Sequence, residues 1–446
     1  MENDVRIHPF SPVTLDAADS VMERLDDNER IAQLFVIRNL ESSNYYAGGY
    51  LLNNLSQNHL SKTIDPNGIP YLIGFDMLNG NNSFAREQQL AESNNLELVS
   101  RYSAAVGDYL RNQNINFILG PALDLYHNDM NTATERHSFS DDANITLNYA
   151  TASVRGYKEA GILSIVGNYP EIGSAKQGYD NDTPILMARS DQLFENELIP
   201  FKGLVNSGIQ NIMVANAHVP AIDSGINYLA TQSPEMNDVL KNILGFNGLI
   251  WADLSIQKVE FKDDPTNAIL VGNDVIIIDG DLEQKVLKVN ESIESGVLSW
   301  NLINQKCKRI IQAKIWSAKN QPRIKDSAVA VMELKLAQRE LTEASLTLLR
   351  NQNDRIPLKN MDTLTIALIN ISDTPSVFQP EWVQRYTSAD IYNIRLNHLE
   401  EDYSNFQRKQ EQYDLVILLG SPQNSLARKR FGISEHYQSI IERISF

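Results

Sequence analysis

Apolar and polar positions follow a regular rhythm along the first two thirds of the chain. Short apolar runs of strand length are separated by longer segments in which apolar residues recur every three to four positions, as on one face of a helix. Eight runs have the length and apolar content of buried strands: 31–37, 49–52, 71–75, 115–119, 163–166, 211–214, 248–251 and 275–278. The helical segments between them include 91–110, 146–160, 192–207 and 233–244, and Gly161, Gly208 and Gly245 mark the ends of three.

Eight strand-and-helix units in succession predict an α/β fold, a closed (β/α)8 barrel of the TIM type. A doubly wound open sheet is the alternative that the same rhythm allows. Functional side chains of a (β/α)8 barrel project from the C-terminal ends of its strands, so chemistry is expected there.

The pattern changes after the barrel. Helical runs at 282–295, 300–318 and 328–349 are followed by apolar runs at 364–371, 391–394 and 415–419 and by a last helical segment at 436–444. We therefore predict a barrel over 1–325, a helical linker over 326–362 and part of a flavodoxin-like α/β sandwich over 363–446. Three parallel strands leave a sheet edge unpaired, which is a liability in a globular protein. We expect the second domain to be truncated, with further chain or a partner chain covering that edge.

Composition narrows the classes of partner. The chain has 446 residues, 42% of them apolar, with 39 Lys and Arg against 56 Asp and Glu, a formal net charge of −17. Nucleic-acid binding needs a basic face that displaces counterions, so no nucleic-acid partner is expected. No apolar run approaches the roughly 18 residues of a membrane span. Residues 1–9 lack the pattern of a signal peptide, so we predict a cytoplasmic protein unless a leader was removed.

Metal ligands are sparse in this sequence. Cys307 is the single cysteine, which excludes an internal disulfide and a cysteine-based zinc site, and it is expected to be a buried, inert thiol within a helix. The seven histidines are dispersed, without the His-x-x-x-His spacing of a metal-binding helix. No metal and no other cofactor is predicted.

Carboxylates stand at three of the predicted strand ends. Asp76 follows the third run, Asp124 the fourth and Asp253 the seventh. Because the strands of a barrel end on one face, Asp253 and Asp76 are expected to project into one cleft, with Asp124 nearby as a supporting group. An Asp in such a place also commonly caps the following loop, and for any one of the three both explanations stay open.

Several short motifs occur in the same order as in one known family. The segments are ELIPF at 197–201, NIMVA at 211–215, VPAID at 219–223, LGFNGLI at 244–250, GND at 272–274 and ASLTLLRNQNDRIPLK at 344–359. Together they resemble the family 3 glycoside hydrolases, in their β-N-acetylglucosaminidase branch, over most of the chain. The resemblance implies retaining hydrolysis of O-glycosyl bonds in glycans that contain N-acetylglucosamine, peptidoglycan fragments among them. It also implies a periplasmic or cell-envelope location if a leader was removed.

The resemblance assigns roles to residues by position. Asp253 corresponds to the family's nucleophilic Asp, which attacks the anomeric carbon and forms a covalent glycosyl intermediate. Asp76 corresponds to the strand-three Asp that binds sugar hydroxyls. Arg136 and His137 stand at the family's R-S-F-G motif and are candidate sugar contacts, with a plain surface role for the Arg as the alternative.

The loop after the fifth strand departs from the family's pattern. Where relatives read K-H-F-P-G-H-G-D-T-x-x-D-S-H, this chain reads GNYPEIGSAKQGYD over 167–180. Gly167 and Asn168 replace the sugar-binding Lys and His, Gly178 replaces the Asp that orients the acid/base His, and Asp180 replaces that His. Asp180 is a candidate substitute acid if burial keeps it protonated, and a solvated turn residue is the alternative.

Other polar residues near these motifs complete the candidate site. The His that follows strand six in the family is replaced by Asn216, and His218 lies two positions later. With Asn168 they are candidate substrate contacts. Glu171 and Asp182 are further carboxylates that could replace the missing acid.

A retaining glycosidase needs a nucleophile and an acid, and this sequence keeps the first while losing the usual second. Loss of such proton transfer typically costs about 10²–10⁴-fold in rate. Three hypotheses stay open: an active β-N-acetylhexosaminidase of altered mechanism or specificity, a non-catalytic glycan-binding protein, and a structural or assembly protein. The first two take a carbohydrate ligand.

Overall fold

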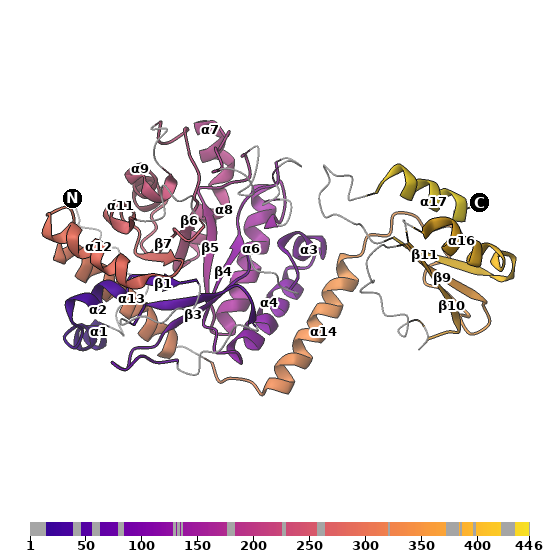
Figure 1. The fold of residues 1–446 in the computed structure, drawn as a ribbon, viewed down its shortest axis with the longest axis horizontal. Coiled ribbons are helices and arrows are strands. Elements are labelled where there is room, and N and C mark those ends of the chain that lie inside the picture. Colours follow the sequence, from indigo (N-terminus) through magenta and orange to yellow (C-terminus); the bar gives the residue numbers. More distant parts are fainter. Residues whose placement is uncertain are drawn as a thin grey trace. The chain divides into compact units, whose positions relative to one another are not determined.

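The structure is a computed structural model of the chain. It describes residues 15–38, 46–55, 63–78, 84–127, 131, 134, 137–175, 183–224, 229–256, 264–319, 322–371, 383, 386–395, 398–420 and 433–445. The chain divides into two compact units, Met1–Leu346 and Thr347–Phe446 (Figure 1). The boundary between the units falls inside the stretch 326–362 that the sequence predicts to be a helical linker.

The first unit is a closed barrel of eight parallel strands in chain order, and this confirms the predicted (β/α)8 fold over the open sheet. The strands are β1 (Phe35–Ile37), β2 (Gly49–Leu52), β3 (Leu72–Asp76), β4 (Phe117–Ala122), β5 (Leu163–Tyr169), β6 (Asn211–Val214), β7 (Leu249–Asp253) and β8 (Val275–Ile278). Pairing of β1 with β8, in which Val36 lies opposite Ile277, closes the ring.

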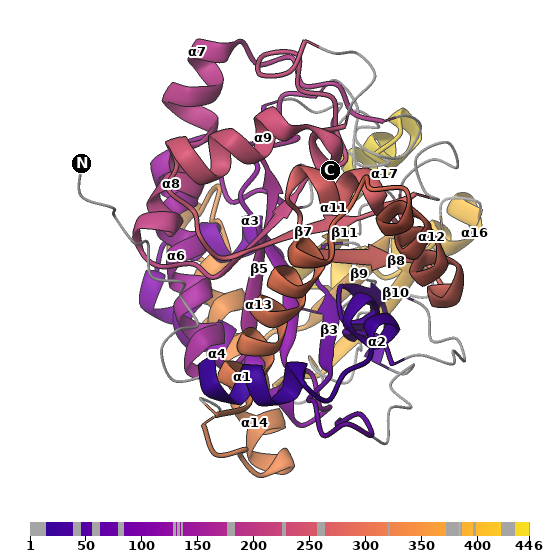
Figure 2. The ribbon, with the colours of Figure 1, turned by 90° about the vertical axis from the view of Figure 1, so that its left-hand side faces the viewer.

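Helices cover the outside of the barrel (Figures 1 and 2). They are α1 (Leu15–Met22), α2 (Asp27–Ala32), α3 (Glu87–Glu92), α4 (Leu96–Arg111), α6 (Ala143–Glu159), α7 (Ser190–Gln192), α8 (Ile199–Asn206), α9 (Pro234–Asp238), α11 (Pro265–Val271), α12 (Leu282–Glu294), α13 (Trp300–Lys319) and α14 (Ser327–Ser345). The π-helical turns Leu193–Glu197 and Val239–Ile243 continue α7 and α9. Gly161, Gly208 and Gly245 have φ values of 79°, 82° and 79°, the left-handed backbone expected where helices end.

Two predicted elements differ from the structure for local reasons. In the predicted strand 31–37, residues 31 and 32 are the end of α2 and residues 33 and 34 form a turn, because Asp26 and Glu29 form a capping box that starts a helix at Asp27. The predicted helix 91–110 is two helices, α3 and α4. Asn94 adopts φ 48° between them, and the Asn95 side chain accepts a hydrogen bond from the Leu98 amide to start the second.

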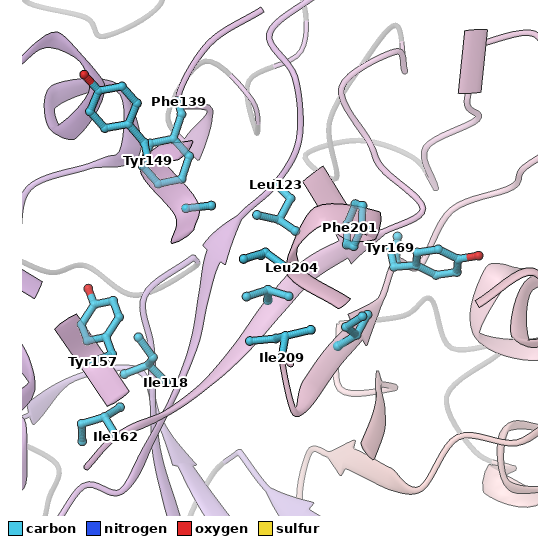
Figure 3. Packing of buried hydrophobic residues seen from close by; sticks show 14 of the residues in the cluster. Ile118, Leu123, Phe139, Tyr149, Tyr157, Ile162, Tyr169, Phe201, Leu204 and Ile209 are labelled. Carbon is cyan, nitrogen blue, oxygen red and sulfur yellow. The ribbon is translucent and has the colours of Figure 1, made fainter. Parts of the chain in front are cut away.

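The barrel core has two layers. Inside the barrel, the rings of Phe117 and Trp251 lie 5.2 Å apart, and a Cβ at Gly74 would meet the Phe117 ring at 2.0 Å, so the interior has no room for a side chain at Gly74. Between strands and helices, buried side chains such as Tyr169 and Phe201 pack edge to face, with centroids 5.4 Å apart (Figure 3). Burial of apolar side chains contributes roughly 25 cal/mol per Å² of apolar surface and stabilises both layers.

Helix α14 belongs to the barrel unit. Its buried residues Leu334, Ala337 and Leu341 join the cluster that lies between strands and helices. On its polar side, Glu340 pairs with Arg101 of α4 at 2.6 Å between Oε2 and Nη2. Among the described residues, no helix is long and apolar enough to cross a membrane.

The second unit contains a partial parallel sheet. Its strands are β9 (Ile366–Ile371), β10 (Ala389–Ile394) and β11 (Leu415–Gly420), ordered β10-β9-β11, with helices α16 (Leu399–Gln407) and α17 (Glu435–Ser445). The central strand β9 is fully buried, whereas residues of β11 stay partly exposed. Coverage of the outer edge by further chain or by a partner remains a prediction.

Candidate functional site

Two of the predicted carboxylates lie at the C-terminal face of the barrel and are connected through one arginine. Asp76 is the last residue of β3 and Asp253 the last residue of β7, while Arg38 directly follows β1. Arg38 Nη1 lies 2.6 Å from Asp76 Oδ2, and Arg38 Nη2 lies 2.5 Å from Asp253 Oδ2. One guanidinium therefore holds together the two side chains to which the sequence assigns the nucleophile and a sugar contact.

Arg38 uses two further donors. Its Nε donates to Ser255 Oγ at 2.7 Å, and Nη1 donates a second hydrogen bond to Asn53 Oδ1 at 2.6 Å. Arg38 is 8% exposed, Asp253 3% and Asp76 0%, so all three charges are removed from water. The planar guanidinium presents its donors in a fixed fork, which suits it to fixing the relative positions of two carboxylates.

Burial and charge act on Arg38 in opposite directions. Desolvation alone favours the neutral form, but the attraction of Asp253 and then of Asp76 prevails and raises the pKa of the Arg38 guanidinium above its ordinary value. Two buried carboxylates and one buried cation leave a net negative charge among these three groups. A further positive or hydrogen-bond-donating group would therefore be stabilised beside them.

The two oxygens of Asp253 are bound differently. Oδ1 accepts hydrogen bonds from the amide and the hydroxyl of Ser255, at 2.9 and 2.5 Å. Oδ2 accepts one hydrogen bond from the described residues, that of Arg38, and a carboxylate oxygen has two lone pairs. Asn216 Nδ2 donates to the backbone oxygen of Asp253 at 2.5 Å, which fixes the end of β7. Oδ2 is therefore the oxygen with capacity for another partner.

Asp124 has a supporting role in the loop that follows β4. Its Oδ2 accepts a hydrogen bond from Asn168 Nδ2 at 2.9 Å, and its Oδ1 accepts one from the Ile172 amide at 2.7 Å. Desolvation raises the pKa of this fully buried carboxyl to about 6, despite these two hydrogen bonds. Asp124 and Asn168 therefore bind each other and fix the loop after β5.

A second buried carboxyl, Glu171, lies in the loop that has lost the family's acid/base motif. It is 1% exposed and hydrogen-bonds the Ser174 amide at 2.8 Å as well as the Ser174 hydroxyl. Desolvation raises the pKa of Glu171 to about 7, and the negative charges of Glu197 and Asp124 add to the effect. Glu171 has the proton affinity of a general acid at neutral pH, but its burial among protein groups separates it from solvent.

His127 lies against the same group of acids. Its Nε2 is 2.8 Å from Glu197 Oε1, and that hydrogen bond raises the pKa of the His127 imidazole. The other oxygen of Glu197 is buried without a hydrogen-bond partner among the described residues. No group of three or more His, Cys, Asp or Glu in the described part of the chain is placed to hold a metal ion.

The other predicted site residues are dispersed. His137 Nδ1 lies 3.2 Å from Glu87 Oε2, at the N-terminus of α3. The backbone of His218 pairs with residues 184 and 186, beyond β6. Arg136 and Asp180 lie outside the described residues, as does Asp182. The structure thus brings Asp253 and Asp76 together through Arg38, and Asn216 contacts the same strand end.

Arg38 is the residue that the sequence reasoning missed. Its signal was present, because Arg38 directly follows the first apolar run, as Asp76 and Asp253 follow the third and seventh. Ser255 and Asn53 were missed as well, and they carry no signal beyond their nearness to strand ends.

Comparison with known proteins places this chain in a family. Residues 10–313 match the model of the glycosyl hydrolase family 3 N-terminal domain. An uncharacterized secreted glycosyl hydrolase of Arthroderma benhamiae is 27% identical over 264 residues, which are 55% of this chain and 74% of that protein. Beta-hexosaminidase A of Pseudoalteromonas piscicida is 22% identical over 371 residues, 74% of this chain and 62% of that protein.

Shorter matches to other beta-hexosaminidases include that of Stenotrophomonas maltophilia strain K279a, 26% identical over 159 residues and covering 46% of that protein. Among solved structures, a family 3 beta-N-acetylglucosaminidase of Paenibacillus superposes with a TM-score of 0.73 at 20% identity, covering 94% of this chain and 88% of that one. The beta-glucosidase of Listeria innocua superposes with a TM-score of 0.74 at 16% identity, covering 96% and 68%. At these identities the structural matches show the shared fold.

Proposed function

The chain belongs to the family 3 glycosyl hydrolases, and on that premise we propose that its barrel recognises β-N-acetylhexosaminides and cleaves them slowly, with Asp253 as nucleophile and without an efficient acid. The sequence similarity to beta-hexosaminidases supports the choice of substrate. The observation that carries the proposal is the position of Asp253 at the end of β7, oriented by Ser255 and Arg38 and with hydrogen-bonding capacity left on Oδ2.

The proposed reaction proceeds in two steps. Asp253 Oδ2 attacks the anomeric carbon, the bond from that carbon to the leaving oxygen breaks, and the leaving group departs with the electron pair. Water then attacks the same carbon and gives up one proton to the solvent, the bond to Asp253 breaks, and the free carboxylate is restored. Without an acid, departure depends on the leaving group's own stability as an anion, so activated aryl glycosides react and ordinary glycans react poorly.

The ion pair with Arg38 makes the nucleophile weaker. Asp253 Oδ2 lies 2.5 Å from the Arg38 guanidinium, which stabilises its negative charge. Part of this attraction must be lost before Oδ2 can attack the anomeric carbon. The same pair also preorganises the carboxylate, because Arg38 and Ser255 leave it a single orientation. We therefore expect Asp253 to be correctly positioned for attack but to react slowly.

A series of aryl N-acetyl-β-D-glucosaminides with leaving groups of increasing pKa tests this proposal. We expect measurable turnover with the 4-nitrophenyl compound, a steep fall of kcat/KM along the series and no turnover of N,N′-diacetylchitobiose. Asp253→Asn should abolish the reaction. A value of kcat/KM that does not change with the leaving group would mean that an acid is present; Asp180→Asn should then lower kcat/KM for poor leaving groups selectively and spare activated ones.

A second candidate function is favoured by a specific observation. Asp76 is fully buried and ion-paired with Arg38, and Asn168 and Asn216 donate hydrogen bonds to protein atoms. A site in which these groups hold one another is also consistent with a carbohydrate-binding protein that does not hydrolyse its ligand. Binding of a chitin oligosaccharide, measured by calorimetry, without turnover of any aryl glycoside would favour this second function. Absence of both would leave a structural or assembly role.

A further inference from the structure

Arg38 lies across the mouth of the barrel. In the closed ring β3 and β7 stand on opposite sides, and β1 stands midway between them. The Arg38 guanidinium contacts the aspartates that end both strands, at 2.6 Å from Asp76 Oδ2 and 2.5 Å from Asp253 Oδ2. Because the two aspartate side chains have the same length, a group that contacts both lies near the middle of the mouth. The guanidinium therefore occupies the face at which (β/α)8 enzymes bind their substrates.

Four hydrogen bonds from segments far apart in the chain hold the guanidinium in this place. Besides the two aspartates, Asn53 Oδ1 accepts from Nη1 just after β2, and Ser255 Oγ accepts from Nε just after β7. The Arg38 side chain is only 7% exposed. Polar groups of several strands thus surround it on all three nitrogens, as they would surround a bound ligand.

Arg38 also takes up binding capacity of the two aspartates. The Asp76 side chain is 0% exposed, and its oxygens accept from the Leu78 amide at 3.0 Å and from Arg38. The Asp253 side chain is 5% exposed, and Ser255 and Arg38 bind its two oxygens. A sugar that presented a hydroxyl to Asp76 and its anomeric carbon to Asp253 would have to lie where the guanidinium lies.

We propose that Arg38 is an internal occupant of the sugar site. The free protein is closed by its own side chain, and a glycoside binds only when the guanidinium leaves Asp76. This inference rests on the proposed function, because it takes the sugar to lie between the two aspartates. The apparent affinity for sugar is then lowered by the small fraction of molecules in which Arg38 has moved away. Arg38 therefore controls how much ligand binds, in addition to weakening the nucleophile.

A purely structural role for Arg38 makes a different prediction. If Arg38 only ties the strand ends together, a variant without it is less stable and gains no ligand. If Arg38 occupies a ligand site, the variant gains an open place between two carboxylates. That place should accept either a small guanidinium ion from solution or a sugar, and the two should exclude each other.

Arg38→Ala is the variant that opens the site, and ethylguanidinium has the same atoms as the part of the side chain that it removes. Ethylguanidinium chloride at about 10 mM should raise the melting temperature of Arg38→Ala at pH 6 by about 3–5 °C, whereas the same concentration of NaCl should not. The wild type should not respond to ethylguanidinium, because its own guanidinium fills the place.

Calorimetry with N-acetyl-D-glucosamine then measures the sugar site. Arg38→Ala should bind this sugar at least about tenfold more tightly than the wild type, and ethylguanidinium should compete with it. Arg101→Ala is the matched control, because it removes an exposed arginine of α4. It should bind the sugar as the wild type does and should not respond to ethylguanidinium.

A second variant keeps the test independent of the fold of Arg38→Ala. Arg38→Ala combined with Asp76→Asn removes one buried cation and one buried anion together, so the net charge at the mouth is that of the wild type. The double variant should also bind N-acetyl-D-glucosamine more tightly than the wild type, because the middle of the mouth is open.

The opposite results would overturn the proposal. Equal affinity for the sugar in the wild type and both Arg38 variants would show that Arg38 does not occupy the sugar's place, and the proposed function would stand. Sugar binding to Arg38→Ala that saturating ethylguanidinium does not reduce would show the same. If ethylguanidinium stabilises Arg38→Ala but no variant binds the sugar, the proposed function fails as well, because an open mouth between the two aspartates takes no sugar.

Discussion

Replacing Arg38 by Met should destabilise the barrel severely. The change removes the cation that lies between two carboxylates that are 0% and 3% exposed, together with the hydrogen bonds to Asn53 and Ser255. Breaking a buried ion pair by removal of one partner costs about 3–5 kcal/mol, because the other partner is left charged in a medium of low dielectric constant. Arg38→Met leaves two carboxylates without this partner. We therefore expect the free energy of unfolding at pH 8 to fall by an amount at or above the upper end of that range.

The destabilisation caused by Arg38→Met should depend on pH. Without Arg38, the folded protein must either keep two buried negative charges that have lost their guanidinium partner or bind a proton to one of them. Proton uptake by the folded state makes stability rise as the pH falls, so the loss caused by Arg38→Met should be smaller at pH 5 than at pH 8. Arg38→Met combined with Asp76→Asn and Asp253→Asn removes all three charges and should recover much of the loss.

Urea unfolding followed by tryptophan fluorescence measures these differences, since Trp251, Trp300 and Trp316 all lie in the barrel unit. The control is Arg101→Met, which breaks the exposed pair with Glu340 and should cost less than about 1 kcal/mol. If Arg38→Met costs no more than Arg101→Met, or if its effect does not depend on pH, Arg38 does not hold the two carboxylates together.

Three further predictions follow from other parts of the barrel. Because burial raises the pKa of Glu171 to about 7 and that of Asp124 to about 6, the folded state binds more protons than the unfolded state between about pH 4 and 7. The free energy of unfolding should therefore fall as pH rises through that window, and Glu171→Gln should reduce the fall by about 1–2 kcal/mol in urea titrations at pH 5 and 8. Gly74→Ala would place a Cβ 2.0 Å from the Phe117 ring and should lower stability by about 3 kcal/mol; the double variant with Phe117→Leu should recover part of it, and no loss in the single variant would refute the packing. Burial raises the pKa of the Cys307 thiol to about 12, so Ellman's reagent should react with it only after unfolding, and prompt reaction in the native protein would show an accessible thiol.

The sequence predicted the barrel because hydrophobic periodicity records which positions are buried. Six of the eight strands begin within one residue of the predicted position, since runs such as 211–214 and 275–278 contain only residues that the structure buries. Register and closure follow from that pattern once eight units are present. The break between α3 and α4 depends on one Asn in a left-handed conformation, which periodicity does not record.

Only part of the candidate site could be predicted from the sequence. Asp76 and Asp253 could be identified because they follow predicted strands. Arg38 binds both of them, but it is distant from both along the chain, and no local sequence pattern predicts such a contact. The raised pKa of Glu171 depends on burial under its own loop and on Glu197 and Asp124, which only the folded chain brings near. The roles of Asp180 and Arg136 remain predictions because both lie outside the described residues.

The most direct test of the proposed chemistry is the intact mass of the protein during reaction with 4-nitrophenyl N-acetyl-β-D-glucosaminide at saturating concentration. In a retaining glycosidase the acid of the first step serves as the base of the second, so a protein without it should accumulate the glycosyl intermediate. We predict a mass increase of one N-acetylhexosaminyl group, located by proteolysis to the peptide that contains Asp253 and absent in Asp253→Asn. No adduct under conditions in which binding of the same compound is demonstrated, or an adduct on another residue, would contradict the account.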